Sequence, residues 1–212
     1  MSSTPVLVRA DNAVSARPLH RAYSLVPRHV YIHVPFCARR CAYCDFSIAV
    51  RRDVPVDDYL DSLERELALR FGDAQPDEVD TIYFGGGTPS RLGGEGLTRA
   101  LEIISRRFVP TRNAEITAEA NPDDMNRDAL RAWRAAGINR LSIGSQSFDD
   151  RVLAWMHRTH DPNAIARAVA DARTAGIANL SLDLIFALPQ SLNRDFESDV
   201  EQALALKPDH IS

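Results

Sequence analysis

Residues 134–143 read RAAGINRLSI, and residues 173–182 read RTAGIANLSL. Both stretches predict the same local structure, a helix that ends at Ala-Gly-Ile and a buried strand that begins at the same offset behind it. Strand-and-helix units that recur every few tens of residues are typical of a parallel sheet with helices packed outside it. The repeat therefore predicts an α/β fold.

Apolar periodicity extends this pattern in both directions along the chain. We expect strands at residues 30–34, 81–84, 115–120, 140–144 and 179–186, and a sixth strand that starts at residue 210. We expect helices over residues 57–71, 97–108, around 130–136, 162–176 and 196–204. Polar residues recur at or just beyond the carboxyl ends of the strands, which favours barrel-like closure over an open doubly wound sheet. The prediction is a partial (β/α)6 TIM-like barrel with strands inside and helices outside, ending in strand six.

The composition is that of an ordinary globular protein. The chain has 212 residues, of which 45% are hydrophobic and 25% are charged, enough for one sizeable core. We expect an N-terminal arm at residues 1–28 and a single core domain at residues 29–212. The arm faintly resembles an organellar transit peptide in its arginines and serines, but a mobile arm is the favoured interpretation.

Charge and hydropathy argue against several classes of partner. The net charge of −4 gives no electrostatic case for a nucleic-acid partner. No apolar run approaches the roughly 20 residues that a membrane span requires, and no secretory signal is recognisable. Clustered free thiols indicate a reducing compartment, so we expect a cytoplasmic protein.

Cys37, Cys41 and Cys44 are the only cysteines, and they form a CxxxCxxC motif. Three thiols are too many for one disulfide and one too few for an all-cysteine zinc site. They suit a four-iron cluster in which three irons are held by protein and the fourth is open. The charge of Arg39 and Arg40 in the same loop would offset an anionic cluster.

Two other interpretations of these cysteines are weaker. A zinc site would need His33 as its fourth ligand, but His33 lies on an expected strand and no second ligand pair follows downstream. A set of three buried core cysteines does not suit so polar a loop. The cluster is the favoured interpretation.

Several further residues are candidates for binding. Gly85, Gly86 and Gly87 follow a strand, where they either let the backbone approach a ligand or form a tight turn. A phosphate-binding loop is disfavoured because the P-loop lysine is missing. Glu119 and Asp183 end apolar strands, where a charge is costly unless it faces a polar cavity or an arginine.

Four other side chains have plainer interpretations. His157 and His160 have no carboxylate partner in the sequence pattern and are expected at the surface. Tyr31 and Tyr43 could serve core packing as readily as a ligand.

The CxxxCxxC motif, with an aromatic residue directly before its last cysteine, resembles that of the radical S-adenosylmethionine enzymes. Further motifs follow in order: YIHVPFC at 31–37, GGGTPS at 85–90, EANP at 119–122, SIGSQSF at 142–148 and DLIFALP at 183–189. Together they are similar to the branch that contains oxygen-independent coproporphyrinogen III oxidase and a related heme chaperone. The resemblance runs from about Tyr31 to Ser212.

This resemblance implies a [4Fe-4S] cluster on the three cysteines, with S-adenosylmethionine on the open iron. It implies one-electron cleavage of the sulfonium to a 5′-deoxyadenosyl radical, with an electron donor of the flavodoxin or ferredoxin type. No catalytic residue is assigned beyond the cluster. The implied S-adenosylmethionine pocket consists of Tyr31, Tyr43, Gly86, Gly87, Thr88, Glu119, Gln146, Arg158 and Asp183.

Phe46 bears on which member of the branch this is. The oxidase has a further cysteine at this position, whereas the chaperone type has Cys-Asp-Phe, as in this chain. We therefore expect a heme chaperone, with heme as an additional cofactor and heme-acceptor proteins as partners. The alternative is the oxidase, which decarboxylates two propionates of coproporphyrinogen III to vinyl groups; a structural iron–sulfur or zinc module is a remote third.

The sequence departs from the family pattern at two positions. Ser145 stands where an apolar residue is usual, and Ala187 stands where glycine is usual. Ala187 implies ordinary backbone angles at its position. The heme-related motif of the family lies in a C-terminal region beyond these residues.

Overall fold

The computed structural model describes residues 27–212. The expected arm, with its likeness to a transit peptide, therefore lies outside the described residues except for its last two. Arg28 at this boundary donates two hydrogen bonds to the Asp80 carboxylate, at 2.6 and 2.8 Å.

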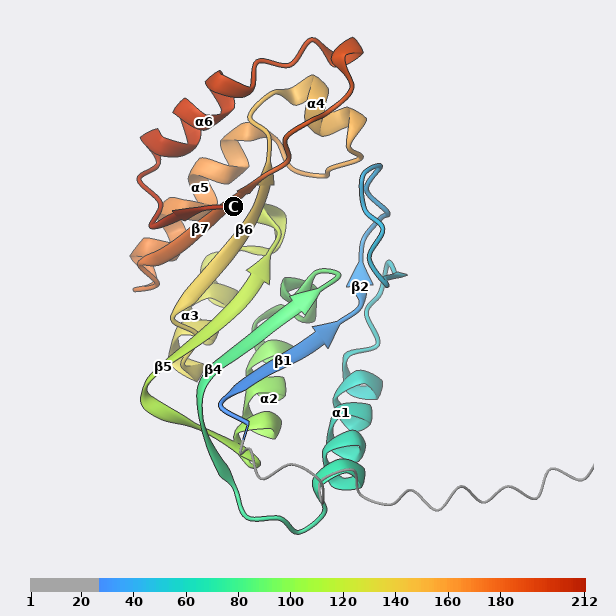
Figure 1. Cartoon of the computed structure of the whole chain (residues 1–212), viewed down its shortest axis with the longest axis vertical. Helices are drawn as coiled ribbons and strands as arrows, with labels where there is room; N and C mark the ends of the chain where they lie inside the picture. Colours follow the sequence, from blue (N-terminus) through green and yellow to red (C-terminus); the bar gives the residue numbers. More distant parts are fainter. Residues whose placement is uncertain (1–26) are drawn as a thin grey trace, which may run out of the picture.

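Six parallel strands form the main sheet, in the order β1-β4-β5-β6-β7-β8. They are β1 (His29–Val34), β4 (Asp77–Gly86), β5 (Phe108–Ala120), β6 (Arg140–Gln146), β7 (Asn179–Leu184) and β8 (His210–Ile211). Strands that are neighbours in the sheet follow one another along the chain, as in a β/α barrel. In a doubly wound sheet the order of the strands would reverse at one point in the sheet. The predicted α/β partial barrel is confirmed (Figure 1).

The helices lie in the connections between strands, and all but α4, which lies beyond the carboxyl end of β6, pack outside the sheet (Figure 1). They are α1 (Val56–Phe71), α2 (Gly93–Ser105), α3 (Arg127–Ala136), α4 (Asp150–Trp155), α5 (Pro162–Thr174) and α6 (Phe196–Ala205). None of the helices in the described part is both long and apolar enough to cross a membrane.

The repeated Ala-Gly-Ile stretches form the same helix cap twice. The Gly137 and Ile138 N–H groups donate to the Arg134 and Trp133 carbonyls, at 3.1 and 3.0 Å. The equivalent bonds at the end of α5 are 2.9 and 3.0 Å long. Gly137 and Gly176 adopt φ of +113° and +87°, the left-handed conformation that this Schellman cap requires. Each cap turns the chain directly into the next strand, as predicted.

The two faces of the sheet differ in polarity. On β1, Ile32 and Val34 are buried in the core, and the alternate Tyr31 and His33 are exposed on the other face. The same alternation along β5, β6 and β7 places Thr117, Glu119, Ser142, Ser181 and Asp183 on the polar face. The apolar side chains pack between the sheet and the helices, and the polar side chains lie on the opposite face of the sheet, inside the partial barrel.

Some boundaries differ from the prediction. Phe108 was expected in a helix and begins β5 instead, seven residues before the predicted start of that strand at Glu115. Its ring packs edge-on against Phe71, with centroids 5.1 Å apart, and Pro110 continues the strand opposite Val79. The strand β7 ends at Leu184, two residues earlier than expected.

Several short elements were not predicted, among them one helix and two strands. The helix α4 spans six residues. Strands β2 (Phe36–Cys37) and β3 (Ala49–Val50) pair in parallel and close the base of the cysteine loop. Elements this short carry too few residues for periodicity to identify them.

Candidate functional site

A cavity of about 590 Å³ opens at the carboxyl ends of the strands. This volume is in the ordinary range for small-molecule sites. Of the predicted site residues, those that line it are Cys37, Cys41, Tyr43, Cys44, Gly86, Gly87, Thr88, Glu119, Gln146, Arg158 and Asp183. The fold thus brings together eleven of the twelve residues that the sequence proposed.

The three thiols are free and half-buried in the loop that follows β1. Backbone bonds from Ala49 to Pro35 (2.7 Å) and from Arg51 to Cys37 (2.9 Å) fix the two ends of the loop. Burial raises the pKa of the Cys37 thiol, while a hydrogen bond with Thr88 at 3.4 Å opposes that rise. An Arg158 guanidinium nitrogen lies 3.6 Å from the Cys41 sulfur. Three thiols that face one cavity beside a cation form a donor set that fits an anionic cluster held by three cysteines.

The zinc alternative loses its fourth ligand. His33 Nε2 lies 3.0 Å from the Ser47 carbonyl oxygen, which can only accept, so this nitrogen carries the hydrogen. The Nδ1 atom then accepts from the Tyr31 hydroxyl at 3.2 Å. Both ring nitrogens are thereby engaged. Across residues 27–212, no three His, Cys, Asp or Glu side chains are grouped as ligands of a single metal ion.

The glycines after β4 allow two chain segments to approach closely. The Gly87 N–H donates to the Val34 carbonyl at 2.8 Å. A Cβ atom on Gly87 would lie 2.6 Å from the Pro35 carbonyl, and one on Gly86 would lie 2.5 Å from the His33 ring. Gly86 also has a φ of +113°. The glycines are therefore required by packing against β1 and the start of the cysteine loop, and they line the cavity as well.

Glu119 and Asp183 face the cavity with hydroxyl and amide partners. Glu119 accepts from the Tyr83 hydroxyl at 2.9 Å and from the Gly86 N–H at 3.1 Å. Asp183 accepts from the Ser142 hydroxyl at 2.9 Å. Burial raises the pKa of both carboxyl groups, that of Asp183 to about 6, and the charge of Glu119 adds to the rise at Asp183. Two partly buried carboxylates without a directly paired arginine in the described chain favour a ligand that carries positive charge.

Arg158 links three parts of the site. Its guanidinium donates to the Gly144 carbonyl at 2.8 Å and to the Asn121 side-chain oxygen, besides approaching Cys41. Its Nε atom is buried and has no partner among the described residues. Arg158 thus joins the ends of β5 and β6 to the cysteine loop.

Gln146 lies at an irregularity between β6 and β7. The pairing register shifts between Ile143 and Gln146, and Gln146 has a φ of +67°. A positive φ is uncommon for a residue other than glycine, and here it occurs at an irregular strand end. Gln146 lines the cavity at this point.

Tyr31 is the one predicted residue that does not line the cavity. Its side chain is 58% exposed, and its ring stacks on Tyr83 with centroids 6.1 Å apart. Tyr83 in turn donates to Glu119. Tyr31 therefore lies one layer further from the cysteines, on the polar face of the sheet.

Several lining residues were missed by sequence reasoning. Asp124 accepts from the Ser90 hydroxyl at 2.7 Å, and its burial raises its pKa. Arg91, Asn121 and Asp123 also line the cavity. Their place in the sequence could have revealed Asn121 and Ser90, the partner of Asp124. Ser90 and Asn121 belong to the GGGTPS and EANP motifs, which span the carboxyl ends of β4 and β5.

Two expectations about nearby residues are wrong. His160 was expected at the surface but is only 5% exposed, and it donates from Nε2 to the Ser145 carbonyl at 3.1 Å. Ala187 was expected to have ordinary backbone angles but has a φ of +55°. The left-handed conformation after β7 is therefore retained without glycine.

Comparison with known proteins agrees with this geometry. The sequence model of the Radical SAM superfamily matches residues 31–203. The heme chaperone HemW of Escherichia coli (strain K12) is 40% identical over 189 residues, which are 89% of this chain and 50% of that protein. HemW of Bacillus subtilis (strain 168) is 38% identical over 186 residues, 87% of this chain and 49% of that protein.

Solved structures show the same fold. The coproporphyrinogen III oxidase HemN from Escherichia coli, described as a radical SAM enzyme, matches with a TM-score of 0.77 at 32% identity, over 87% of this chain and 44% of that one. The radical S-adenosylmethionine methyltransferase TsrM from Kitasatospora setae matches with a TM-score of 0.57 at 17% identity, over 85% of this chain and 35% of that one. The chain spans about half the length of the curated relatives it matches.

Proposed function

Because this chain belongs to the radical SAM superfamily, in the branch that contains HemN and HemW, we propose that it carries the cofactor-binding part of a heme chaperone. Membership of the superfamily implies a [4Fe-4S] cluster and S-adenosylmethionine. The assignment of particular residues to these groups, and the role of heme, are our proposals.

In this proposal Cys37, Cys41 and Cys44 hold the cluster. When bound, the cluster and S-adenosylmethionine supply one-electron reductive cleavage of the sulfonium. The chain itself orients the ligand. Thr88 hydrogen-bonds to Cys37, and Arg158 keeps a positive charge beside Cys41.

The observation that supports S-adenosylmethionine most directly is the pair of partly buried carboxylates in the cavity. Glu119 and Asp183 both line the cavity, and burial raises the pKa of each because it disfavours the ionised carboxylate. S-adenosylmethionine carries an ammonium and a sulfonium, so its binding would offset these charges. We also assign Tyr43, Gly86, Gly87 and Gln146 to this pocket because they line the same cavity. Tyr31 acts, in this proposal, through Tyr83 and Glu119.

The choice of chaperone over oxidase rests on Phe46. Its side chain is 66% exposed, and it lines the cavity at the position where the oxidase has a further cysteine. The identities of 38% and 40% to proteins described as heme chaperones support the same choice. The oxidase is the second candidate, because HemN matches the fold with a TM-score of 0.77.

The proposal includes partners and a compartment. An electron donor of the flavodoxin or ferredoxin type would reduce the cluster, and a heme-acceptor protein would receive the heme. The free thiols of the cysteine loop suit a reducing, cytoplasmic-type compartment.

Two assays on protein reconstituted without oxygen test the proposal. For a chaperone, titration with heme should produce a saturable Soret band, and an added apo-heme protein should remove that heme. The oxidase predicts instead that coproporphyrinogen III is converted to protoporphyrinogen IX while S-adenosylmethionine is consumed. Turnover without heme binding would overturn the chaperone assignment in favour of the oxidase.

A further inference from the structure

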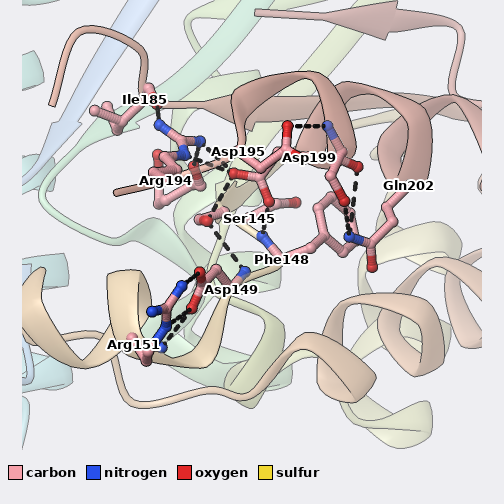
Figure 2. Close-up of polar contacts among 12 residues, drawn as sticks. Ser145, Phe148, Asp149, Arg151, Ile185, Arg194, Asp195, Asp199 and Gln202 are labelled. Atoms are coloured by element: carbon pink, nitrogen blue, oxygen red, sulfur yellow. Dashed lines mark hydrogen bonds and ion pairs between the residues drawn. The ribbon is translucent and has the colours of Figure 1, made fainter. Parts of the chain in front are cut away.

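Arg194 and Asp199 form a buried ion pair behind the cavity. Their side chains are 6% and 2% exposed, and the closest nitrogen and oxygen atoms are 2.6 Å apart. Arg194 precedes α6, and Asp199 lies in its first turn. Figure 2 shows the Arg194 guanidinium between Ile185 and Asp199. Neither partner lines the cavity.

The Arg194 guanidinium joins the ends of two strands. It donates to the Gln146 carbonyl at the end of β6, at 3.1 Å, and to the Ile185 carbonyl just past β7. The Ile185 N–H also donates to the Gln146 carbonyl, at 3.1 Å. Gln146 and Ile185 both line the cavity. One side chain from the α6 region therefore fixes two backbone positions of the site.

Asp199 fixes the residues that follow Gln146. One carboxylate oxygen accepts from the Phe148 N–H at 2.6 Å, as Figure 2 shows. The other accepts from the Ser147 hydroxyl at 2.7 Å, besides the bonds from Arg194. The ion pair and its hydrogen bonds thus hold the segment from Gln146 to Phe148 from two directions.

The backbone here needs such support. Gln146 has a φ of +67°, which is strained for a residue with a side chain, and it lies where the β6–β7 register shifts. Such a conformation persists only where the surroundings determine it. The planar fork of Arg194 can donate in several directions at once, so it reaches the Ile185 carbonyl and gives the Gln146 carbonyl a second donor beside the Ile185 N–H.

We propose that Arg194, held by Asp199, is a positioning residue that sets the affinity of the cavity for S-adenosylmethionine. It does so by fixing the backbone of Gln146 and Ile185, and thereby couples α6 to the cofactor site. This inference rests on the proposed function, since it takes S-adenosylmethionine as the ligand of the cavity.

The test compares Arg194→Met with Arg107→Met. Arg107 pairs with Asp77 at 2.6 Å, with side chains 9% and 21% exposed, at the amino ends of β4 and β5. This control pairs a buried arginine with a partly buried aspartate on other strands of the same sheet, at the end opposite the cavity. Arg194→Lys keeps the positive charge but not the planar guanidinium, so it should retain part of the S-adenosylmethionine affinity that Arg194→Met loses.

The first measurement uses protein without cluster or cofactor. Hydrogen exchange at Phe148 and Ile185 should speed up in Arg194→Met and stay at the wild-type rate in Arg107→Met. The second measures S-adenosylmethionine binding to the cluster-loaded protein at equal cluster content. We expect roughly tenfold weaker binding for Arg194→Met, an intermediate value for Arg194→Lys, and wild-type binding for Arg107→Met.

The outcomes separate the two hypotheses. Wild-type affinity in Arg194→Met, or an equal loss in Arg107→Met, would overturn the positioning role. If wild-type protein itself binds no S-adenosylmethionine, the proposed function fails, while the exchange rates still decide whether Arg194 fixes this backbone. If Arg194→Met does not fold, Ser147→Ala, which removes one bond to Asp199, takes its place with the same exchange and binding measurements.

Discussion

The carboxylate of Glu119 accepts a hydrogen bond from the backbone N–H of Gly86, with the two atoms 3.1 Å apart. This bond ties the end of β5 to the glycine turn after β4. The same carboxylate faces the cavity. Glu119 therefore shapes the loop and also places a negative charge where a cationic ligand would bind.

Glu119→Gln should weaken S-adenosylmethionine binding by about ten- to a hundredfold, because a hydrogen bond to a charged group contributes roughly 1.5–3 kcal/mol. Equilibrium dialysis with labelled S-adenosylmethionine measures this loss. Glu115→Gln is the matched control, since Glu115 lies on the same face of β5 and bonds to Thr117 outside the cavity. Equal affinities in the two variants would remove Glu119 from the proposed pocket.

Gly87→Ala should destabilise the protein by about 1–3 kcal/mol, the usual cost of overpacking. Its new Cβ would lie 2.6 Å from the backbone carbonyl of Pro35, where no flexible side chain can move aside. Because Pro35 precedes the cysteine loop, the cluster content after reconstitution should fall as well.

Gly93→Ala separates contact from backbone strain. Gly93 has a φ of +73°, but a Cβ there would meet nothing within 4 Å. Chemical denaturation should show a loss of stability in this variant, and iron analysis should show a normal cluster content. A cluster loss as large as that of Gly87→Ala would mean that the close approach to Pro35 is unimportant.

Cys41→Ala should abolish the iron–sulfur cluster, because a cubane held by two thiolates lacks the third ligand that the motif supplies. Iron and sulfide content after anaerobic reconstitution, together with the visible absorption spectrum, measure this. Ala42→Ser alters the neighbouring exposed position of the same loop and should keep the cluster. An intact cluster spectrum in Cys41→Ala would contradict the ligand assignment.

How much of this could be predicted from the sequence depends on how local each determinant is. The caps at Gly137 and Gly176 need only a few consecutive residues, and both were predicted correctly. The start of β5 was hidden because Pro110 ends a helical pattern and yet continues a strand here. The cysteines were found from their local CxxxCxxC spacing, and the pocket residues at the strand ends were found from the resemblance to the radical S-adenosylmethionine enzymes.

Contacts between distant segments could not be predicted in the same way. The buried position of His160 is tied to the carbonyl of Ser145, fifteen residues away, to which its ring donates. The pair of Arg194 and Asp199 belongs to no recognised motif, and its partners at Gln146 and Ile185 are defined only by the folded backbone.

Asp183 makes the apoprotein less stable as the pH rises. Burial raises the pKa of this carboxyl from an ordinary 3.8 to about 6. Between these values the folded state binds more protons than the unfolded state, so stability falls with rising pH by about 1.4 kcal/mol per unit. The groups around it are Glu119 and Arg140, whose charges act in opposite directions on this pKa, and the hydroxyls of Ser142 and Ser181.

Asp183→Asn should therefore raise the stability of the apoprotein at pH 7 by about 2–3 kcal/mol and leave it nearly unchanged at pH 4. Urea denaturation at the two pH values measures this difference. The same variant should bind S-adenosylmethionine more weakly, since it removes a charge from the cavity. An equal stability gain at both pH values would show that the titration of Asp183 is not the cause.

His160 has the opposite effect over the same pH range. Burial, aided by the charge of Arg158, lowers the pKa of its imidazole from 6.5 to about 4. Between these values the unfolded state binds more protons, so stability is lost as the pH falls, by about 1.4 kcal/mol per unit. In the wild type this slope and that of Asp183 largely cancel between pH 4 and 6.

His160→Gln keeps a donor for the Ser145 carbonyl and removes the titration. Its apoprotein should lose stability as the pH rises from 4 to 6, because the contribution of Asp183 is no longer balanced. Asp183→Asn should show the reverse slope, and the double variant should lose both contributions and keep only the pH dependence of other groups, among them Glu119 and Asp124, whose pKa values burial also raises. Urea denaturation of the three variants in steps across this range measures the slopes; parallel curves for both single variants would contradict the assignment of the two pKa shifts.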